Sequence, residues 1–420
     1  MRSELDASER DVYVWVWLPG SASPVPAGVL APRGNRFVFR YGRSYRSNPA
    51  AIALSGLELP LGPDPIEPRA GLTLAGCLAD AMPDAWGQRV ILHRHLHAAT
   101  VHHDTNELPL TTYLLESGSD RFGAIDFQQS PTEYVDRTTA ATLEQLRSAA
   151  DLLEAGEPLP APLDDVLLHG SSIGGARPKA LLRDGRRCLI AKFGSRHDTT
   201  PVVKAEAVAM NLARRVGLTV ASTEITRSLG HDVLLVDRFD RTPDGGRRPV
   251  ASALTLLGLD AVTGGRYATY YDLADVIRAR FAHPAATLRE LYARIIFNIL
   301  IGNTDDHARN HAAFWDGREY ALTAAYDLCP QTRSGGEAVQ AMAIGRDGYR
   351  YSQLAGCIPA ASTYLLERSD AIAIVNHQLD VVHEGWAAAA DEVGLTASER
   401  TQLLGRSILN PYAREGWPPP

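Results

Sequence analysis

The chain has 420 residues, of which 45% are apolar and 22% are charged, and its formal net charge is −7. That length is enough for two or three globular units, and the composition excludes a disordered, collagen-like or coiled-coil chain. The four cysteines are far apart and form no Cys-x-x-Cys pair, which gives no support to a disulfide framework or a zinc ribbon. The acidic balance also disfavours a dedicated nucleic-acid-binding protein, because phosphate binding requires a basic face.

The first residues predict neither export nor membrane insertion. Residues 1–11 have no basic region, and the apolar run at 12–18 is too short for a signal peptide or a membrane span. We therefore expect a cytoplasmic protein.

The N-terminal part is predicted to be rich in β-strand. Val12, Val14 and Val16 alternate with aromatic residues, and apolar runs at 28–30 and 37–39 flank a turn at 32–35. This pattern is typical of a small sheet or barrel. From 72 to 96 the apolar spacing becomes helical, with Pro83 marking a break or a new helix start.

Helices and strands alternate in the middle of the chain, and the remainder is mostly helical. The predicted elements are a helix at 142–155 ended by Gly156, a linker at 157–165, two strands about an Asp184-Gly185 turn, a helix near 202–216, a strand at 233–239, a helix at 285–300 and a strand-like run at 321–327. We expect three parts: a β-rich N-terminal subdomain (1–139), an N-lobe (140–240) and a helical C-lobe (241–420).

The distribution of lysine is unusual. The chain has only three lysines, Lys179, Lys192 and Lys204, and all lie within 26 consecutive residues, whereas arginine supplies every other cation. Chance clustering in an arginine-rich chain is one explanation. A functional one is that a compact, reorientable ammonium is needed there, as where a point charge meets a phosphate.

A dense polar cluster follows the helix at 285–300. Within it, Asp305 and Asn310 have the Asp-x-x-x-x-Asn spacing of a protein-kinase catalytic loop, in which the Asp accepts a hydroxyl proton and the Asn holds a metal ion. The spacing alone is weak evidence, since a polar loop would also contain it. A second acid, Asp327, ends the strand-like run that follows, where phosphoryl transfer needs a metal-binding Asp.

The complementary half of such a site lies upstream. Lys192 ends the strand-like run Leu-Ile-Ala-Lys, and Glu206 follows on a predicted helix from which it could pair with the lysine. Residues 172–179 are rich in small side chains, which lets backbone N–H groups approach an anion. The order of these parts indicates kinase chemistry on an α+β, two-lobed, protein-kinase-like fold, with residues 236–241 joining the lobes.

These residues resemble the HipA family, the serine/threonine kinase toxins of type II toxin–antitoxin modules. The motifs that carry the resemblance are the N-terminal β-rich segment, Leu-Ala-Asp-Ala-Met-Pro-Asp-Ala-Trp-Gly (78–87), Asp-Arg-Phe-Gly-Ala (120–124), Ser-Ile-x-Gly-Ala-x-x-Lys (172–179), Asp-Arg-Phe-Asp-Arg (237–241) and Thr-Asp-x-His-Ala-x-Asn (304–310). Together they cover nearly the whole chain.

The resemblance implies roles for individual residues. Asp305 would be the catalytic acceptor of the substrate's hydroxyl proton, Asn310 and Asp327 would hold Mg²⁺, and Ser172 would be autophosphorylated, which silences the kinase. The residues implied in binding ATP are Gly174, Gly175, Ala176, Arg177, Lys179, Lys192, Asp237, Arg238, Phe239, His307, Asn310, Tyr326 and Asp327. This chain departs from the family at Asp306, where a glycine is common, and at Pro178, which stiffens the loop.

The resemblance also implies a biological setting. Family substrates are translation components, notably aminoacyl-tRNA synthetases. The implied partners are a small HipB-like helix-turn-helix antitoxin and, through it, operator DNA. The net charge of −7 fits a protein that reaches DNA mainly through its partner.

Three other interpretations remain open at this stage. His93, His95, His97, His102 and His103 form a cluster in which His93 and His97 would share a helix face and could bind zinc. A small-molecule kinase would use the same Asp-x-x-x-x-Asn logic. A non-catalytic co-repressor would use the fold only to bind antitoxin and DNA.

Overall fold

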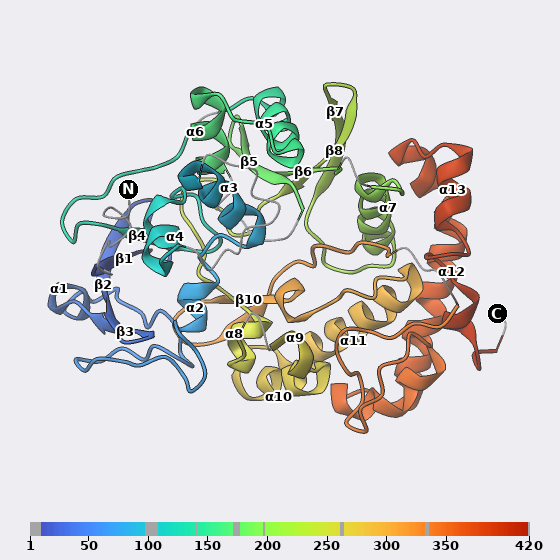
Figure 1. Cartoon of the computed structure of the whole chain (residues 1–420). Coiled ribbons are helices and arrows are strands. Elements are labelled where there is room, and N and C mark those ends of the chain that lie inside the picture. The colour runs from blue at the N-terminus through green and yellow to red at the C-terminus, as the bar shows by residue number, and fades with distance from the viewer. Residues whose placement is uncertain are drawn as a thin grey trace.

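The computed structural model describes residues 10–96, 108–139, 141–170, 177–195, 198–260, 264–331 and 336–418. Three groups of elements lie side by side in it (Figure 1): an N-terminal sheet with short helices, a second sheet flanked by helices, and a mostly helical C-terminal part. No helix in these ranges has a stretch long and apolar enough to cross a membrane. All four cysteines are free thiols.

The N-terminal sheet has four antiparallel strands in the order β3-β2-β1-β4. Its strands are β1 (Val12–Trp17), β2 (Pro24–Arg33), β3 (Arg36–Tyr41) and β4 (Ile125–Gln128). The accompanying helices are α1 (Arg43–Arg46), α2 (Gly76–Ala79), α3 (Ala85–Leu96) and α4 (Leu110–Glu116). The predicted hairpin is confirmed, and Pro83 separates α2 from α3 as the sequence indicated.

The second sheet, in the order β5-β6-β8-β7, is covered on both faces. Val233 and Leu235 pack with the cores of α3, α5 and α6, whereas Leu234 and Val236 pack with α7. This alternation follows from the two-residue period of a strand. The elements are α5 (Leu143–Ala155), α6 (Ala161–Gly170), β5 (Lys179–Asp184), β6 (Arg187–Phe193), α7 (Val202–Arg215), β7 (Thr223–Ser228) and β8 (His231–Asp237).

The predicted helix at 142–155 is confirmed, but the predicted linker at 157–165 is wrong in its second half. Thr142 caps α5 in a reciprocal capping box with Gln145, and Gly156 ends the helix with a φ of 70°. Helix α6 begins inside the predicted linker, at Ala161. Prolines are tolerated in the first turn of a helix, where the missing N–H would have no partner, so they mark a helix start here rather than a linker.

The C-terminal part packs helices around α11 (Pro284–Ile301), which is buried along most of its length. Its three-stranded sheet has the order β11-β10-β9. The other elements are β9 (Val250–Ser252), α8 (Ala253–Leu257), α9 (Gly264–Tyr267), α10 (Tyr270–Arg280), η3 (Ala308–Asn310), β10 (Ala312–Trp315), β11 (Tyr320–Leu322), η4 (Ala355–Tyr364), α12 (Arg368–Val393), α13 (Ala397–Leu403) and η5 (Pro411–Arg414).

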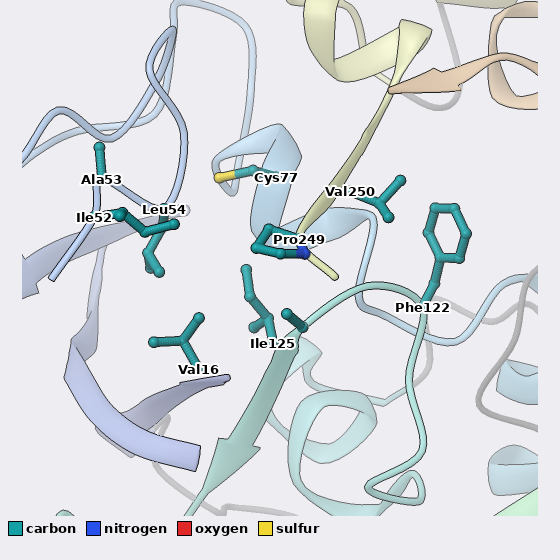
Figure 2. A pocket seen from close by; sticks show the side chains of 10 residues that line it. Val16, Ile52, Ala53, Leu54, Cys77, Phe122, Ile125, Pro249 and Val250 are labelled. Carbon is teal, nitrogen blue, oxygen red and sulfur yellow. The ribbon is translucent and has the colours of Figure 1, made fainter. Parts of the chain in front are cut away.

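The N-terminal sheet is joined to the C-terminal part by an apolar junction. Figure 2 shows Val16 and Ile125 of the sheet and Cys77 of α2 around Pro249, which directly precedes β9. Beside it lies a buried network of charges, in which Asp120 accepts from Arg238 at 2.9 Å and from Arg241 at 2.6 Å. Because these arginines follow β8, the N-terminal part forms ion pairs with the segment that connects the second sheet to the C-terminal part.

Gly302 ends α11 and sets the direction of the loop that follows it. Its φ is 69°, and a Cβ atom there would lie 2.5 Å from the backbone oxygen of Ser407. We expect Gly302→Ala to lower the free energy of unfolding by more than about 2 kcal/mol, because it combines left-handed strain with overpacking. Denaturant unfolding measures this loss.

Gly394 provides a matched control for that substitution. It ends α12 with a φ of 70°, but no atom lies within 4 Å of the position that a Cβ atom would occupy there. Gly394→Ala should therefore cost only the backbone strain, about 1 kcal/mol. Equal losses in the two variants would contradict a steric role for Gly302.

Candidate active site

Two lysines and two carboxylates meet beside the second sheet. Antiparallel pairing of β5 with β6 places Lys179 opposite Lys192. The Lys192 ammonium donates to Glu206 of α7 at 2.5 Å and to Asp327 at 2.6 Å. The predicted partner of Lys192 is thus in place, and the lysine also joins α7 to the segment after β11.

The charges in this cluster shift one another's titration. Burial favours the neutral form of Lys192, but the carboxylates of Asp327 and Glu206 outweigh burial and raise its pKa. The Lys192 ammonium lowers the pKa of Asp327 against the effect of burial. Burial and the like charge of Lys192 lower the pKa of Lys179. Lys192 and Asp327 are therefore a charged pair at neutral pH.

Asp327 does not lie at the end of a strand, as the run at 321–327 predicted. Strand β11 ends at Leu322, and beyond it Ala325 makes a parallel bridge to Val220. Asp327 itself has a φ of 60°. Aspartate is one of the few residues that tolerate this left-handed conformation, and such conformations concentrate at functional sites. The turn aims its carboxylate at Lys192.

The structure separates the roles of the two adjacent acids after α11. Asp306 is 1% exposed, and its Oδ2 accepts from Tyr270, from Asn298 at 2.8 Å and from His311 at 2.9 Å. Asp305 is exposed. Because Asp306 is committed to buried donors, Asp305 is the acid of this pair that an incoming hydroxyl can reach.

The electrostatic surroundings of Asp305 suit proton acceptance. Partial enclosure by the protein raises its pKa, His307 opposes that rise, and the carboxylates of Asp327 and Asp306 add to it. A carboxylate with a raised pKa is a stronger base.

Asn310 has a side-chain oxygen that finds no hydrogen-bond partner among the described residues. Its Nδ2 donates to Asp327 Oδ2 at 3.0 Å, which orients the amide and leaves Oδ1 buried and without a hydrogen-bond partner among the described residues. A buried acceptor without a partner is unfavourable unless something binds it. An amide oxygen beside a carboxylate is a donor set that Mg²⁺ prefers, so these two residues fit the metal that the sequence predicted.

The side chains of the segment predicted to contact adenine are bonded to or packed against other protein side chains. The Arg238 side chain is buried and bonded to Asp240 and Asp120, so it is not free to bind a nucleotide. The Asp237 carboxylate accepts from Arg187 at 3.1 Å. Phe239 packs against Tyr326, with ring centroids 5.5 Å apart. Arg238 and Asp237 are thus engaged in ion pairs with other side chains, and Phe239 is engaged in ring packing.

The loop before β5 is only partly described. Ser172, Gly174, Gly175 and Ala176 lie outside the described residues. Arg177, the next residue, donates to Asp198 at 2.7 Å.

Lys204 does not belong to the site, contrary to the idea that all three lysines serve one function. It points to the far side of α7 and donates to Glu399 at 3.2 Å and to the backbone oxygen of Gly394. A helix turns by about 100° per residue, so Lys204 and Glu206 face different ways.

The zinc alternative finds no support in the described residues. His95 pairs with Glu116 at 2.8 Å and His93 is buried, whereas His97, His102 and His103 lie outside the described ranges. The described residues contain no group of three or more His, Cys, Asp or Glu side chains that could hold a metal ion.

Two interactions of the site went unnoticed in the sequence. Asp84, which directly precedes α3, forms an ion pair with Arg309 in the loop between Asp305 and Asn310. Tyr326 donates to the backbone oxygen of Arg309 at 2.6 Å. Asp84 lies within the motif at 78–87, so the motif was visible, but its distance of more than two hundred residues from Arg309 hid the contact.

Comparison with known proteins agrees with this arrangement. A family model described as the HipA-like C-terminal domain matches residues 171–390, and one described as the HipA N-terminal domain matches residues 16–128. Y4mE of Sinorhizobium fredii, whose name contains the word kinase, is 28% identical over 229 residues, which are 45% of this chain and 54% of that protein. The serine/threonine-protein kinase toxin HipA of Shewanella oneidensis is 26% identical over 186 residues, 37% of this chain and 42% of the toxin.

A solved structure shares the fold over nearly the whole length. It is a chain of the complex of the Shewanella oneidensis toxin–antitoxin system HipA, HipB and its operator DNA, and it covers 93% of this chain and 97% of its own with a TM-score of 0.64 and 20% identity. The predicted α+β, two-lobed, HipA-like fold is thus confirmed. In sequence, the chain spans about half the length of the curated relatives it matches.

The two adjacent acids should differ sharply in their effect on stability. We expect Asp306→Asn to lower the free energy of unfolding by about 2 kcal/mol or more at neutral pH, because it removes a charged acceptor from buried donors. Asp305→Asn should change it by less than about 0.5 kcal/mol. Denaturant unfolding of both variants tests this.

The pH dependence gives a second check on Asp306. Burial raises the pKa of Asp306. The nearby His311 and the hydrogen bonds from His311 and Tyr270 lower it by more, so the pKa lies below its usual range. Its contribution to stability is therefore complete above the unfolded pKa of about 3.9 and is lost as the pH falls through the folded pKa. The difference in free energy of unfolding between wild type and Asp306→Asn should therefore become smaller at acidic pH. A difference that does not change with pH would contradict this role of Asp306.

Proposed function

The chain belongs to the family of the HipA-like C-terminal domain, whose match covers just over half of it, and on that premise we propose that it is an ATP- and Mg²⁺-dependent serine/threonine protein kinase. One observation carries the proposal: Lys192 bridges Glu206 and Asp327, and Asn310 next to Asp327 keeps a buried oxygen without a partner among the described residues. Protein kinases need this set of a strand lysine, its helix glutamate and two metal ligands.

Binding of ATP would draw on the cations of the second sheet. Lys192 would contact the phosphates while Glu206 keeps its ammonium oriented. Lys179 lies opposite Lys192 on β5 and adds a second ammonium. The small residues from Gly174 to Ala176 would offer backbone N–H groups to the phosphates, and Phe239 and Tyr326 would border the adenine.

Asn310 and Asp327 would hold the metal. When bound, Mg²⁺ would neutralise charge on the phosphate oxygens of ATP. Asn310 meets this role with its Oδ1, and Asp327 with a carboxylate that Lys192 keeps ionised.

Asp305 would be the general base. A serine or threonine hydroxyl of the substrate would give its proton to the Asp305 carboxylate as its oxygen bonds to the γ-phosphorus. The bond from that phosphorus to the bridging oxygen would break, and ADP would leave. Exposure of Asp305 leaves room for a protein substrate.

We further propose that the kinase is the toxin of a type II toxin–antitoxin module and acts in the cytoplasm. The HipA-like fold supports this, because the similar Shewanella oneidensis chain was solved with HipB and operator DNA. A HipB-like antitoxin and, through it, operator DNA would then be its partners. Its substrate would be a translation component such as an aminoacyl-tRNA synthetase, and Ser172 would be the site of self-inactivation.

The first test is phosphate transfer by the purified protein. After incubation with ATP and Mg²⁺, wild type should gain one phosphate at Ser172, detected by intact mass and peptide mapping. Asp305→Asn should gain it at least about 10²-fold more slowly, because the general base is lost.

Two controls make this result decisive. Mapping before incubation shows whether Ser172 was already phosphorylated, and Ser172→Ala should abolish the mass gain while still phosphorylating an added protein substrate. A wild type that modifies neither itself nor any protein substrate would overturn the kinase proposal. Transfer only to small-molecule acceptors would support a small-molecule kinase instead.

The metal requirement should depend on Asn310. We expect Asn310→Ala to raise the Mg²⁺ concentration for half-maximal phosphate transfer by about 10-fold, because it removes the oxygen that has no partner among the described residues. Asn211→Ala is the control, since Asn211 lies on α7 and donates to Glu392 away from the site. An unchanged Mg²⁺ requirement in Asn310→Ala would remove Asn310 from the metal site.

A further inference from the structure

We propose that Asp84 is a positioning residue of this site: its carboxylate holds Arg309 and so fixes the loop that presents Asn310 to the metal. The inference rests on the proposed function and extends it, because it makes the N-terminal subdomain part of the catalytic apparatus.

The position of Asp84 is itself well determined. Its backbone oxygen accepts from Gln88 at 2.8 Å as α3 begins, so the residue lies at the helix N-terminus rather than in a free loop. Its side chain is 21% exposed and that of Arg309 is 35% exposed. An ion pair that is mostly withdrawn from water is less screened than a surface pair, and an arginine holds its carboxylate in a definite geometry.

A second carboxylate of the same segment contacts the strand next to β10. Asp80, four residues earlier in the chain, accepts from the backbone N–H of Ser252 at 2.7 Å and from its hydroxyl at 2.6 Å. Ser252 is paired with Ala312, the first residue of β10 after the loop. Asp84 therefore contacts the arginine of the loop, and Asp80 contacts β9, which pairs with the strand that follows the loop.

The contacts that fix Arg309 also restrict Asn310, the proposed metal ligand, because the two residues are joined by one peptide bond. Arg309 is held by Asp84 at its side chain and by Tyr326 at its backbone oxygen. The next residue is Asn310, whose amide is oriented by Asp327. With both ends of Arg309 held, the short η3 turn has little freedom, and the oxygen of Asn310 keeps one direction.

The negative charge of Asp84 also affects Lys179 of β5. It opposes the lowering of the Lys179 pKa by burial and by Lys192, and it raises the pKa of Arg309. One carboxylate of the N-terminal subdomain thus has electrostatic effects on a strand residue of the second sheet and on the arginine of the η3 turn.

The test compares Asp84→Asn with a matched control in the full-length protein. Asp165→Asn removes a different ion pair made by α3, in which Arg94 binds Asp165 of α6 at 3.1 Å. Neither residue of this pair belongs to the loop that contains Asn310. Two quantities are measured: hydrogen exchange of the backbone amides at 303–311 without ligand, and binding of a non-hydrolysable ATP analogue with and without Mg²⁺.

We expect Asp84→Asn to speed exchange at 303–311 about tenfold and to weaken Mg²⁺-dependent binding of the analogue about tenfold, with metal-free binding changed less than about twofold. Asp84→Glu should retain most of the protection from exchange and most of the Mg²⁺-dependent binding of the analogue. Asp165→Asn should change neither. Arg309→Gln should reproduce the effects of Asp84→Asn, and the double variant should be no worse than either single variant.

The outcomes separate this inference from the kinase proposal. If Asp84→Asn and Asp165→Asn behave alike in both measurements, Asp84 is not a positioning residue. If metal-free and metal-dependent binding fall equally, its role is general stability and the inference fails. If wild type binds no nucleotide, the kinase proposal fails, and the exchange data alone decide whether Asp84 holds the loop.

Discussion

The ammonium of Lys192 is the interaction on which the arrangement of the site depends. Through its two ion pairs it connects side chains of β6, α7 and the turn after β11. Withdrawing an ammonium from water costs several kcal/mol, so its position is stable only where carboxylates surround it. Glu206 and Asp327 meet that need, and in doing so they bring the second sheet and the C-terminal part to one point.

The N-terminal subdomain supports this point from outside. Its Asp120 binds Arg238 and Arg241 after β8, and its Asp84 binds Arg309, the residue before Asn310. One contact is made to the segment that follows β8 and the other to the short η3 turn, and neither is made to a long helix or a strand. Connecting segments carry the functional side chains but have few backbone hydrogen bonds of their own, so contacts from a third part of the chain are what holds them still.

Local patterns were sufficient where short-range chemistry decides the structure. Gly156 marked the end of α5, because a helix C-cap depends on residues within one turn. Patterns failed where tertiary contacts override them. Helix α6 begins among prolines that suggested a linker, and β11 ends at Leu322 because Ala325 pairs with Val220 instead. The proximity of three lysines in sequence likewise did not place Lys204 in the site.

The sequence by itself determined the family, the order of the candidate site residues and most of the long helices, since these follow from motifs and from the spacing of apolar residues. Only the tertiary structure decided which acid of the pair is buried, and Asp306 took that place because Tyr270 of α10, Asn298 of α11 and His311 just before β10 converge on it. It also decided that Asp84 meets Arg309. Contacts between residues hundreds of positions apart depend on how layers pack, and no local pattern records that packing.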